Sequence, residues 1–227
     1  MTRDFFDELE KCGLGYCADK MAEYAELVLK VNEYMNLTRI TDPKEMAIKH
    51  FADSAHPDIL AFIPQNARVI DVGTGGGFPG VPIKLAREDV GMTFMESVGK
   101  KLEFVKNACE DMGIEGKFIC ARAEETADLR EKFDVCVSRA VAALPVLLEL
   151  CSPLVKVGGV VLAYKGANAD EEIAAAKSAA AKLNLSLIKK QPVNTPGAEH
   201  CVLVYKKTAP TPKAYPRRFA QIKKHNL

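Results

Sequence analysis

Short apolar runs rich in β-branched residues alternate with helix-length segments from residue 67 onward, and this alternation constrains the fold more than any other feature of the sequence. In chain order the runs are ARVIDV (67–72), GMTFME (91–96), KFICA (117–121), FDVCVS (133–138), GVVLAYK (159–165), SLIKK (186–190) and HCVLVYK (200–206). Helices are predicted between the first six runs, beginning near Gly80, Val98, Glu124, Ala140 and Ala169. Because continuous apolar strands that alternate with helices are buried on both faces, the pattern indicates an α/β fold with a parallel, doubly wound sheet.

The two ends of the chain differ from this alternating region. Residues 191–199, between the last two runs, are too few for a crossover helix, so these strands are predicted to form an antiparallel hairpin. Apolar residues recur every three or four positions over 19–35, and a second helical stretch is predicted over 44–60. The predicted organisation is a helical subdomain at 1–64, an α/β domain with seven strands at 65–207 and a basic tail at 208–227.

The charge is distributed unevenly along the chain. The formal net charge is only +1, with 31 Lys and Arg against 30 Asp and Glu. The segment from 200 to 227 nevertheless holds seven of these basic residues and no acidic residue, so a body of −6 carries an end of +7. This pattern suggests an anionic partner that is engaged at one end of the molecule.

Several protein classes are excluded by what the sequence lacks. The N-terminus MTRDFFDELEKCG has no basic region followed by an apolar one, and no apolar run is long enough to span a bilayer. A cytoplasmic protein without a membrane partner is therefore expected. The seven Cys are scattered, with no CxxC pair and no Cys/His cluster, so reduced thiols are expected and a metal site is not.

The first apolar run leads directly into the glycine cluster VIDVGTGGGFPG (69–80). In an open α/β sheet, the loop after the first strand is where a ligand meets the start of a helix. Gly75, Gly77 and Gly80 satisfy the dinucleotide pattern G-x-G-x-x-G. Read from Asp71, the same segment also gives the acid-x-G-x-G-x-G pattern of class I S-adenosylmethionine-dependent methyltransferases, through Gly73, Gly75 and Gly77.

Electrostatics distinguishes the two ligands. A carboxylate such as Asp71 would repel a pyrophosphate, whereas S-adenosyl-L-methionine has no phosphate and carries an ammonium and a sulfonium cation. Glu96 ends the second predicted strand, where a carboxylate can accept hydrogen bonds from ribose hydroxyls. The methyl donor is therefore favoured as the cofactor, and a nicotinamide dehydrogenase is the least favoured enzyme.

His50, Asp53 and Ser54 resemble the residues of a hydrolase triad. At spacings of three and four they share one face of a predicted helix, whereas a triad needs its members to converge from separate elements beside an oxyanion hole. We interpret them as a polar face that docks the N-terminal helices on the catalytic domain or lines the substrate cleft.

Eight short segments along the chain carry a family resemblance through their order and spacing: Asn36-Leu37-Thr38, His50-x-x-Asp53-Ser54, DVGTGGGFPG (71–80), Glu96-Ser97 with Lys100-Lys101, Arg122-Ala123-Glu124, Ser138-Arg139-Ala140, Lys165-Gly166 and Tyr215-Pro216-Arg217-Arg218. Through them, nearly the whole chain resembles the glucose-inhibited division protein B (GidB) family of bacterial 16S rRNA guanine-N7 methyltransferases, whose target is guanine 527. The resemblance implies a Rossmann-like class I methyltransferase fold with a mostly parallel seven-stranded sheet, a C-terminal antiparallel hairpin and a small N-terminal helical extension. The ending FAQIKKHNL departs from the family, which has a Gly-x-Pro turn and a Pro-Leu ending there.

The resemblance also implies roles for individual residues. Gly73 and Phe78 are expected at the methionine end of the cofactor, Ala123 and Glu124 beside its adenine, and Arg139 in the pocket facing the substrate. Phe78 could equally be a core aromatic, and Glu124 could only cap a helix. The residues expected to contact 16S rRNA in the small ribosomal subunit are Lys165, Arg217, Arg218, Lys223 and Lys224.

Guanine N7 carries an exposed lone pair, so the implied transfer needs an in-line approach and a favourable electric field, and no general base. Arg139 is the expected catalytic residue, acting on the base through O6 or on a flanking phosphate. A flipped or unpaired guanine is the expected substrate, and the enzyme is expected to be a monomer. The alternatives are a small-molecule methyltransferase and a non-catalytic RNA- or ribosome-binding protein that retains the fold.

Overall fold

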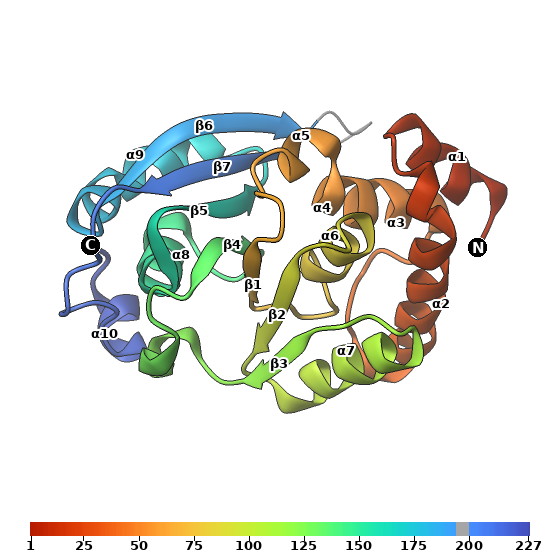
Figure 1. Ribbon diagram of the computed structural model, residues 1–227, viewed down its shortest axis with the longest axis horizontal. Helices are drawn as coiled ribbons and strands as arrows, with labels where there is room; N and C mark the ends of the chain where they lie inside the picture. Colours follow the sequence, from red (N-terminus) through yellow and green to blue (C-terminus); the bar gives the residue numbers. More distant parts are fainter. Residues whose placement is uncertain (194–199) are drawn as a thin grey trace.

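The computed structural model describes residues 1–193 and 200–227, which form one seven-stranded sheet in the order β3-β2-β1-β4-β5-β7-β6 (Figure 1). The strands are β1 (Arg68–Val72), β2 (Gly91–Glu96), β3 (Lys117–Cys120), β4 (Phe133–Arg139), β5 (Val155–Lys165), β6 (Leu185–Val193) and β7 (His200–Lys207). β7 is antiparallel to both of its neighbours, and the other pairings are parallel. The predicted fold class and C-terminal hairpin are confirmed. Most of the predicted 191–199 connection, 194–199, lies outside the described residues.

Helices precede the sheet and cover it. They are α1 (Arg3–Lys11), α2 (Ala18–Met35), α3 (Pro43–Met46), the π-helical segment η2 (Ala47–Ala52), α4 (Asp53–Ala55), α5 (Pro57–Leu60), α6 (Gly80–Ala86), α7 (Gly99–Asp111), α8 (Leu144–Cys151), α9 (Ala169–Lys182) and α10 (Phe219–Lys224). The predicted helix over 44–60 is interrupted at His56, which has an extended ψ of 136°. The cause is Pro57, because the residue before a proline is disfavoured in helical conformation.

Two of the predicted helices differ from the structure. The helix expected near Glu124 is wrong: the segment forms only two 3-10 turns, Ala123–Glu125 and Ala127–Leu129, which are separated by Thr126, whose ψ of 58° is not helical. The helix expected near Ala140 starts at Leu144 instead. Ala140 has a φ of 57°, so the chain turns there after β4 before it can enter a helix.

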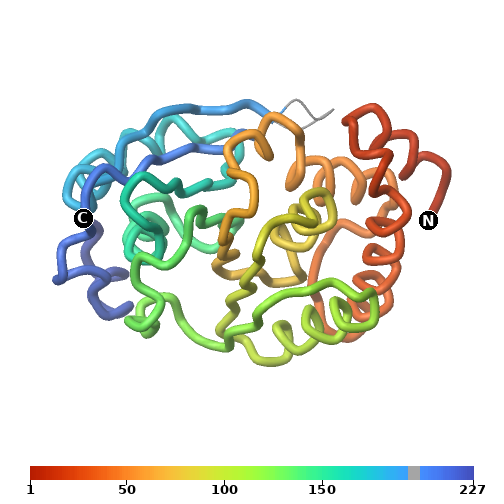
Figure 2. The backbone as a smooth tube through the Cα atoms, in the orientation of Figure 1, coloured from red at the N-terminus to blue at the C-terminus, as the bar shows by residue number. Residues whose placement is uncertain are grey.

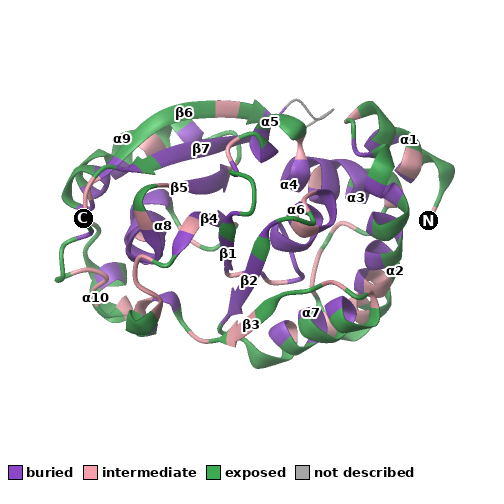
Figure 3. Cartoon of the chain, in the orientation of Figure 1, coloured by how far each residue is buried: buried purple, intermediate pink, exposed green. Residues whose placement is uncertain are grey.

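Each face of the sheet has its own hydrophobic core. Val135 and Val137 of β4 point into a core shared with α1, α2, α6 and α7, whereas Cys136 points into a core shared with α8, α9 and α10. This alternation is what a strand that is buried on both faces requires. In Figure 3 the central strands are buried, whereas the edge strand β6 is largely exposed. Since the N-terminal helices share a core with the sheet, the division at 64 and 207 stays a prediction.

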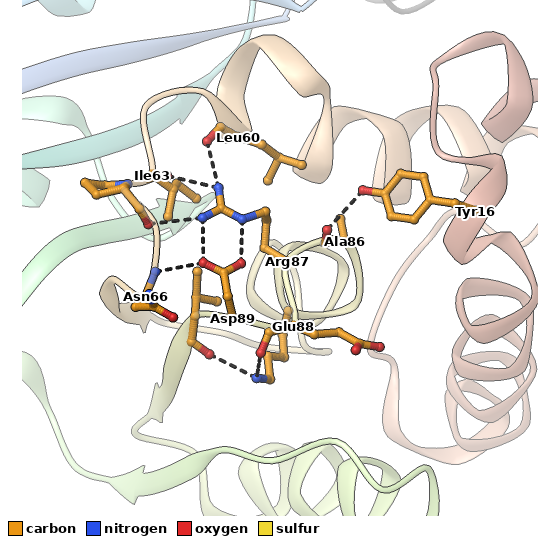
Figure 4. Close-up of polar contacts among 11 residues, drawn as sticks. Tyr16, Leu60, Ile63, Asn66, Ala86, Arg87, Glu88 and Asp89 are labelled. Carbon is orange, nitrogen blue, oxygen red and sulfur yellow. Dashed lines mark hydrogen bonds and ion pairs between the residues drawn. The ribbon is translucent and has the colours of Figure 1, made fainter.

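One arginine in the connection between α6 and β2 holds the link between α5 and β1 (Figure 4). The Arg87 guanidinium donates to the carbonyl oxygens of Leu60 and Ile63, at 3.4 and 3.0 Å, and pairs with Asp89 at 2.7 Å. Asp89 in turn accepts from the Asn66 backbone N–H at 2.8 Å. The pairing with Arg87 lowers the pKa of Asp89, so the carboxylate stays charged.

The two termini lie at opposite ends of the long axis (Figure 2). The basic C-terminal segment packs on the protein: Ile222 of α10 is fully buried, and Arg130 donates to the carbonyl oxygens of Tyr215 and Thr211. Arg217 pairs with the buried Glu149 at 2.7 Å. Among the helices of the described residues, none combines the length and apolar character needed to cross a bilayer.

Candidate functional site

A cleft of about 1310 Å³ opens at the carboxyl ends of β1, β2 and β4. Gly73 follows β1, Glu96 ends β2 and Arg139 ends β4, and all three line the cleft. Ligands of open α/β sheets bind at this edge. The volume exceeds the range of roughly 300–1,000 Å³ that is typical for one small ligand, so the cleft can hold a cofactor together with part of a second molecule.

The glycine loop forms one wall of the cleft. Gly73 has a φ of 74°, and its backbone N–H donates to the Met95 carbonyl of β2 at 2.8 Å. A Cβ at Gly73 would lie 2.3 Å from Val141, so a larger residue would displace the opposite wall. The loop therefore needs glycine at this position both for its backbone conformation and for its close approach to Val141.

Asp71 and Gly77, two of the predicted cofactor contacts, do not line the cleft. Asp71 is fully buried, and its Oδ2 accepts from the Thr74 hydroxyl at 2.6 Å and from the Gly80 N–H at 2.9 Å. Burial raises the pKa of Asp71 to about 7. A Cβ at Gly77 would lie 2.0 Å from the Tyr24 hydroxyl. Both residues therefore support the loop from the side that faces away from the cleft. The sequence motif alone could not distinguish this supporting role from contact with the ligand.

The Glu96 carboxylate is held by backbone donors and can still accept a hydrogen bond from a ligand. Its Oε2 accepts from the Gly75 N–H at 3.0 Å, and its Oε1 accepts from the Val98 N–H at 3.0 Å. Oε1 also accepts a long hydrogen bond from the Ser97 hydroxyl, at 3.4 Å. A carboxylate can accept about four hydrogen bonds, so Oε2 can take a further donor from the cleft. This fits a ligand that offers a hydroxyl group, such as a ribose. Ala123 and Glu124 line the same part of the cleft.

Arg139 joins the sheet to the N-terminal helices. Its Nη1 donates to the Lys49 carbonyl at 3.0 Å and to Asp53 Oδ2 at 3.2 Å, and its Nη2 lies 3.1 Å from His50 Nδ1. The guanidinium also lies 5.4 Å from the centre of the Phe78 ring. Its Nε–H and second Nη2 hydrogen have no acceptor in the part of the chain that the structure describes. Arg139 can therefore donate to a ligand as well as hold the helices.

His50 is a neutral ring with a defined tautomer. Because an arginine is only a donor, His50 Nδ1 must accept from Arg139 and Nε2 must carry the proton. Nε2 then donates to the Thr38 hydroxyl, 2.7 Å away. Burial, reinforced by the Arg139 charge, lowers the pKa of His50 to about 3, which agrees with this assignment. The ring stacks on Phe78 with centroids 4.6 Å apart.

The interpretation of His50, Asp53 and Ser54 as a docking face is confirmed. Besides the Arg139 contacts, Asp53 Oδ1 lies 3.2 Å from His200 Nδ1, and the Ser54 carbonyl accepts from the Tyr164 hydroxyl at 2.7 Å. The Asp53 carboxylate raises the pKa of His200. His50 and Asp53 also line the cleft, so the same residues do both.

Sequence reasoning assigned no role to Thr38, His200 and Tyr164, which also line the cleft. Thr38 belongs to the segment Asn36-Leu37-Thr38, and the resemblance of this segment to the family was the only sign in the sequence that Thr38 has a role at the site. His200 and Tyr164 lie on strands where nothing in the local pattern separates them from ordinary sheet residues. In the described part of the chain, no group of three His, Cys, Asp or Glu side chains is placed to hold a metal ion.

The five basic residues that we predicted to contact RNA fall into two groups. Lys165 is largely buried and pairs with Glu172 at 2.7 Å, and Arg217 pairs with Glu149. Those two charges are already neutralised within the chain. Arg218, Lys223 and Lys224 are exposed, and no ion pair engages them in the described residues.

The comparisons with known proteins identify relatives along most of the chain. A family model described as GidB, rRNA small subunit methyltransferase G, matches residues 17–200. A protein named ribosomal RNA small subunit methyltransferase G from Lactobacillus delbrueckii is 43% identical over 203 residues, 86% of this chain and 85% of the relative. A protein of the same name from Halalkalibacterium halodurans is 38% identical over 224 residues, 95% of this chain and 94% of the relative.

Solved structures agree on the fold. An O-methyltransferase from neocarzinostatin biosynthesis, crystallised with S-adenosylmethionine, has a TM-score of 0.54 at 18% identity and covers 66% of this chain and 52% of its own. The m1A22 tRNA methyltransferase of Bacillus subtilis has a TM-score of 0.54 at 15% identity and covers 67% of this chain and 64% of its own. The fold is therefore that of methyltransferases, and the sequence matches are closer and longer: the chain belongs to the GidB family, rRNA small subunit methyltransferase G.

Proposed function

We propose that this protein uses S-adenosyl-L-methionine to methylate N7 of one guanine, guanine 527, in 16S rRNA of the small ribosomal subunit. One observation supports this proposal above all others. In a member of the GidB family, a single cleft of about 1310 Å³ runs from the glycine loop and Glu96 to the Arg139 cluster. A cofactor at the loop and a base at Arg139 would thus share one open cleft.

The residues of the loop fit the cofactor. Glu96 accepts the ribose hydroxyls, Ala123 and Glu124 flank the adenine, and Gly73 and Phe78 lie toward the methionine end. When bound, S-adenosyl-L-methionine supplies an electrophilic methyl group on a sulfonium. The protein's part is to present N7 in line with that methyl group, which is catalysis by proximity and orientation.

The chemistry needs no general base, and the site matches this. The N7 lone pair attacks directly, the purine gains a positive charge as the sulfonium loses its own, and no proton moves. His50, whose pKa is lowered to about 3, is neutral and already bonded through both ring nitrogens, so it is not a proton acceptor for the reaction. Arg139 is the catalytic residue because its unused N–H groups can hold the base.

The RNA is bound by a basic surface. Arg218, Lys223 and Lys224 contact phosphates, since they are exposed and unpaired among the described residues. The target guanine enters the cleft flipped or unpaired, because a stacked base could not reach the cofactor. One chain supplies both walls of the cleft, so the proposed reaction needs no second copy, and we take the protein to act as a monomer in the cytoplasm, where ribosomes are found.

Methyl transfer from labelled S-adenosyl-L-methionine tests the proposal. We would use 30S subunits and bare 16S rRNA from a strain that lacks this enzyme, and map the modified base by cleavage at N7-methylguanine. We expect label in 16S rRNA at guanine 527 only. Label on another atom or base, or none in either RNA, would overturn the proposal. Calorimetry with S-adenosyl-L-methionine alone separates a failure of cofactor binding from a failure of RNA recognition.

A further inference from the structure

Thr38 lies beside the glycine loop although it belongs to the N-terminal helical region. A Cβ at Gly76 would lie 3.5 Å from the Leu37 side chain, so the 37–38 segment packs directly on the loop. Thr38 itself is partly exposed and lines the cleft. Its backbone N–H donates to the Asn32 side chain at 2.8 Å, which fixes the residue on the end of α2. Its hydroxyl is therefore a positioned group in the wall of the cleft.

The hydrogen bonds of Thr38 leave its hydroxyl able to act only as a hydrogen-bond donor. Its Oγ1 accepts from His50 Nε2 at 2.7 Å and from the Ile40 backbone N–H at 3.0 Å. A hydroxyl has two lone pairs and one hydrogen, so both acceptor positions are filled. Within residues 1–193 and 200–227 nothing accepts the hydroxyl hydrogen once His50 Nδ1 accepts from Arg139. Thr38 can therefore donate to a ligand in the cleft and cannot accept from one.

A donor-only group distinguishes purines at C6. Guanine offers N7 and O6 as neighbouring acceptors, whereas adenine offers N7 beside the N6 amino group, a donor. In the proposed reaction N7 must keep its lone pair for the methyl group, so O6 is the acceptor left for the protein. A donor-only hydroxyl matches O6 and leaves an amino group at C6 facing another donor.

We propose that Thr38 is a specificity-determining residue that donates a hydrogen bond to O6 of the target guanine, and that the Arg139–His50 pair holds it in the donor state. The inference rests on the proposed function and names how that site selects its base. Arg139 is also only a donor, so the two residues favour the same edge of the purine. Discrimination by unmatched polar groups is stronger than discrimination by shape.

The test changes one group on each side of the contact. Thr38→Val removes the hydroxyl, Thr38→Ser keeps it, and Thr41→Val is a matched control at an exposed threonine outside the cleft. The substrates are reconstituted 30S subunits whose 16S rRNA carries, by ligation, guanine or 2,6-diaminopurine at position 527. The latter keeps N7 and has an amino group in place of O6. Initial rates of methyl transfer are measured for each pair.

T38V also leaves the His50 Nε2–H and the Ile40 N–H without their acceptor, a loss that falls on both bases alike. Beyond that shared loss, we expect T38V to lose roughly 2- to 10-fold on guanine relative to diaminopurine, the worth of one hydrogen bond. The preference for guanine should shrink by that factor, and T38S and T41V should keep it. An equal loss on both bases, or no loss, would overturn the inference. The proposed function would still stand in that case, provided that the wild-type protein methylates N7 of guanine 527. Absence of transfer by the wild-type protein would overturn both.

A measurement on the wild-type protein covers the case in which T38V does not fold. Nitrogen-15 NMR of labelled histidine at pH 7 should show His50 with a protonated Nε2 and an unprotonated Nδ1. The opposite tautomer would free an acceptor position on Thr38 and would overturn the donor-only assignment. The dissociation constant for S-adenosyl-L-methionine should be unchanged in T38V, since the proposed contact is with the base.

Discussion

Arg139 at the cleft and Arg217 in the C-terminal segment both pair with a buried carboxylate, but the two regions use the pair differently. Arg217 binds Glu149 through Nε and Nη2 at 2.8 and 2.7 Å, and its backbone N–H bonds the same carboxylate. Arg139 divides its donors among Asp53, the Lys49 carbonyl and His50, and it lines the cleft. Arg217 does not line the cleft.

The difference teaches that position on the fold, more than residue type, separates a site arginine from a structural one. Both residues are buried for most of their length. Arg139 ends a central strand at the edge where ligands bind, whereas Arg217 fixes the C-terminal segment (208–227) against α8. Each of the following changes tests whether the two arginines are distinct in this way.

Arg139→Ala should have the largest effect. We expect methyl transfer to fall by about 10²- to 10³-fold, because a donor that is positioned for the reacting base is removed. Transfer to 30S subunits and circular dichroism of the same sample measure activity and fold. Arg139→Lys is the matched variant, and it should recover only part of the rate because it lacks the planar fork. Full activity in R139A would remove Arg139 from the site.

Arg217→Ala should instead reduce stability. It leaves the Glu149 carboxylate, which is 1% exposed, without its partner, and we expect a loss of about 3–5 kcal/mol in the free energy of unfolding. Urea unfolding measures this loss. Replacing both partners by Met should recover most of it, and Arg218→Ala should stay within about 0.5 kcal/mol of wild type. A large loss of rate in folded R217A would erase the distinction from Arg139.

Acid should weaken the cleft region through His50. The folded pKa is about 3 and the unfolded value is 6.5, so below pH 6.5 the unfolded chain takes up a proton that the folded chain does not. Stability is therefore full above pH 6.5 and falls with pH down to about 3, by about 1.4 kcal/mol per pH unit. Urea unfolding between pH 7 and 4 should show a shallower fall in His50→Gln. Equal slopes would mean that His50 is not held neutral.

The smallest effect should come from changing the exposed basic residues of the C-terminal segment. Replacing Arg218, Lys223 and Lys224 by Ala should lower the slope of log affinity for rRNA against log salt by up to about 2, at a modest cost in affinity at physiological salt. Filter binding at several salt concentrations measures the slope. R217A should leave it unchanged, because that guanidinium is already paired with Glu149. An equal change in both variants would show that Arg217 contacts RNA too.

Much of the fold could be predicted because periodicity reports burial directly. A strand such as β4 is apolar on both sides, and that pattern is compatible with a sheet covered on both faces. The helix predictions failed near Glu124 and Ala140, where Thr126 has a non-helical ψ and Ala140 a left-handed φ. Such local departures carry no periodic signal.

The site was predictable where a single loop creates it and much less so where distant segments meet. Glu96 and Arg139 follow from their places at strand ends. Thr38 and His200 are remote from both in the sequence. Packing of the N-terminal helices on the sheet places Thr38 in the cleft, and pairing of β7 with β5 places His200 there. The motif also assigned Asp71 to the ligand, although its carboxylate turns inward to hold Thr74 and Gly80.

The sequence by itself determined the α/β class, the glycine loop with its acidic partner at Glu96 and the concentration of positive charge after residue 200, because these depend on local pattern and composition. Tertiary structure alone decided which charges remain available: it paired Lys165 with Glu172 and Arg217 with Glu149 and left Arg218 exposed. It also decided that His50 is neutral. Partners and burial set charge and protonation, and both arise only when the chain has folded.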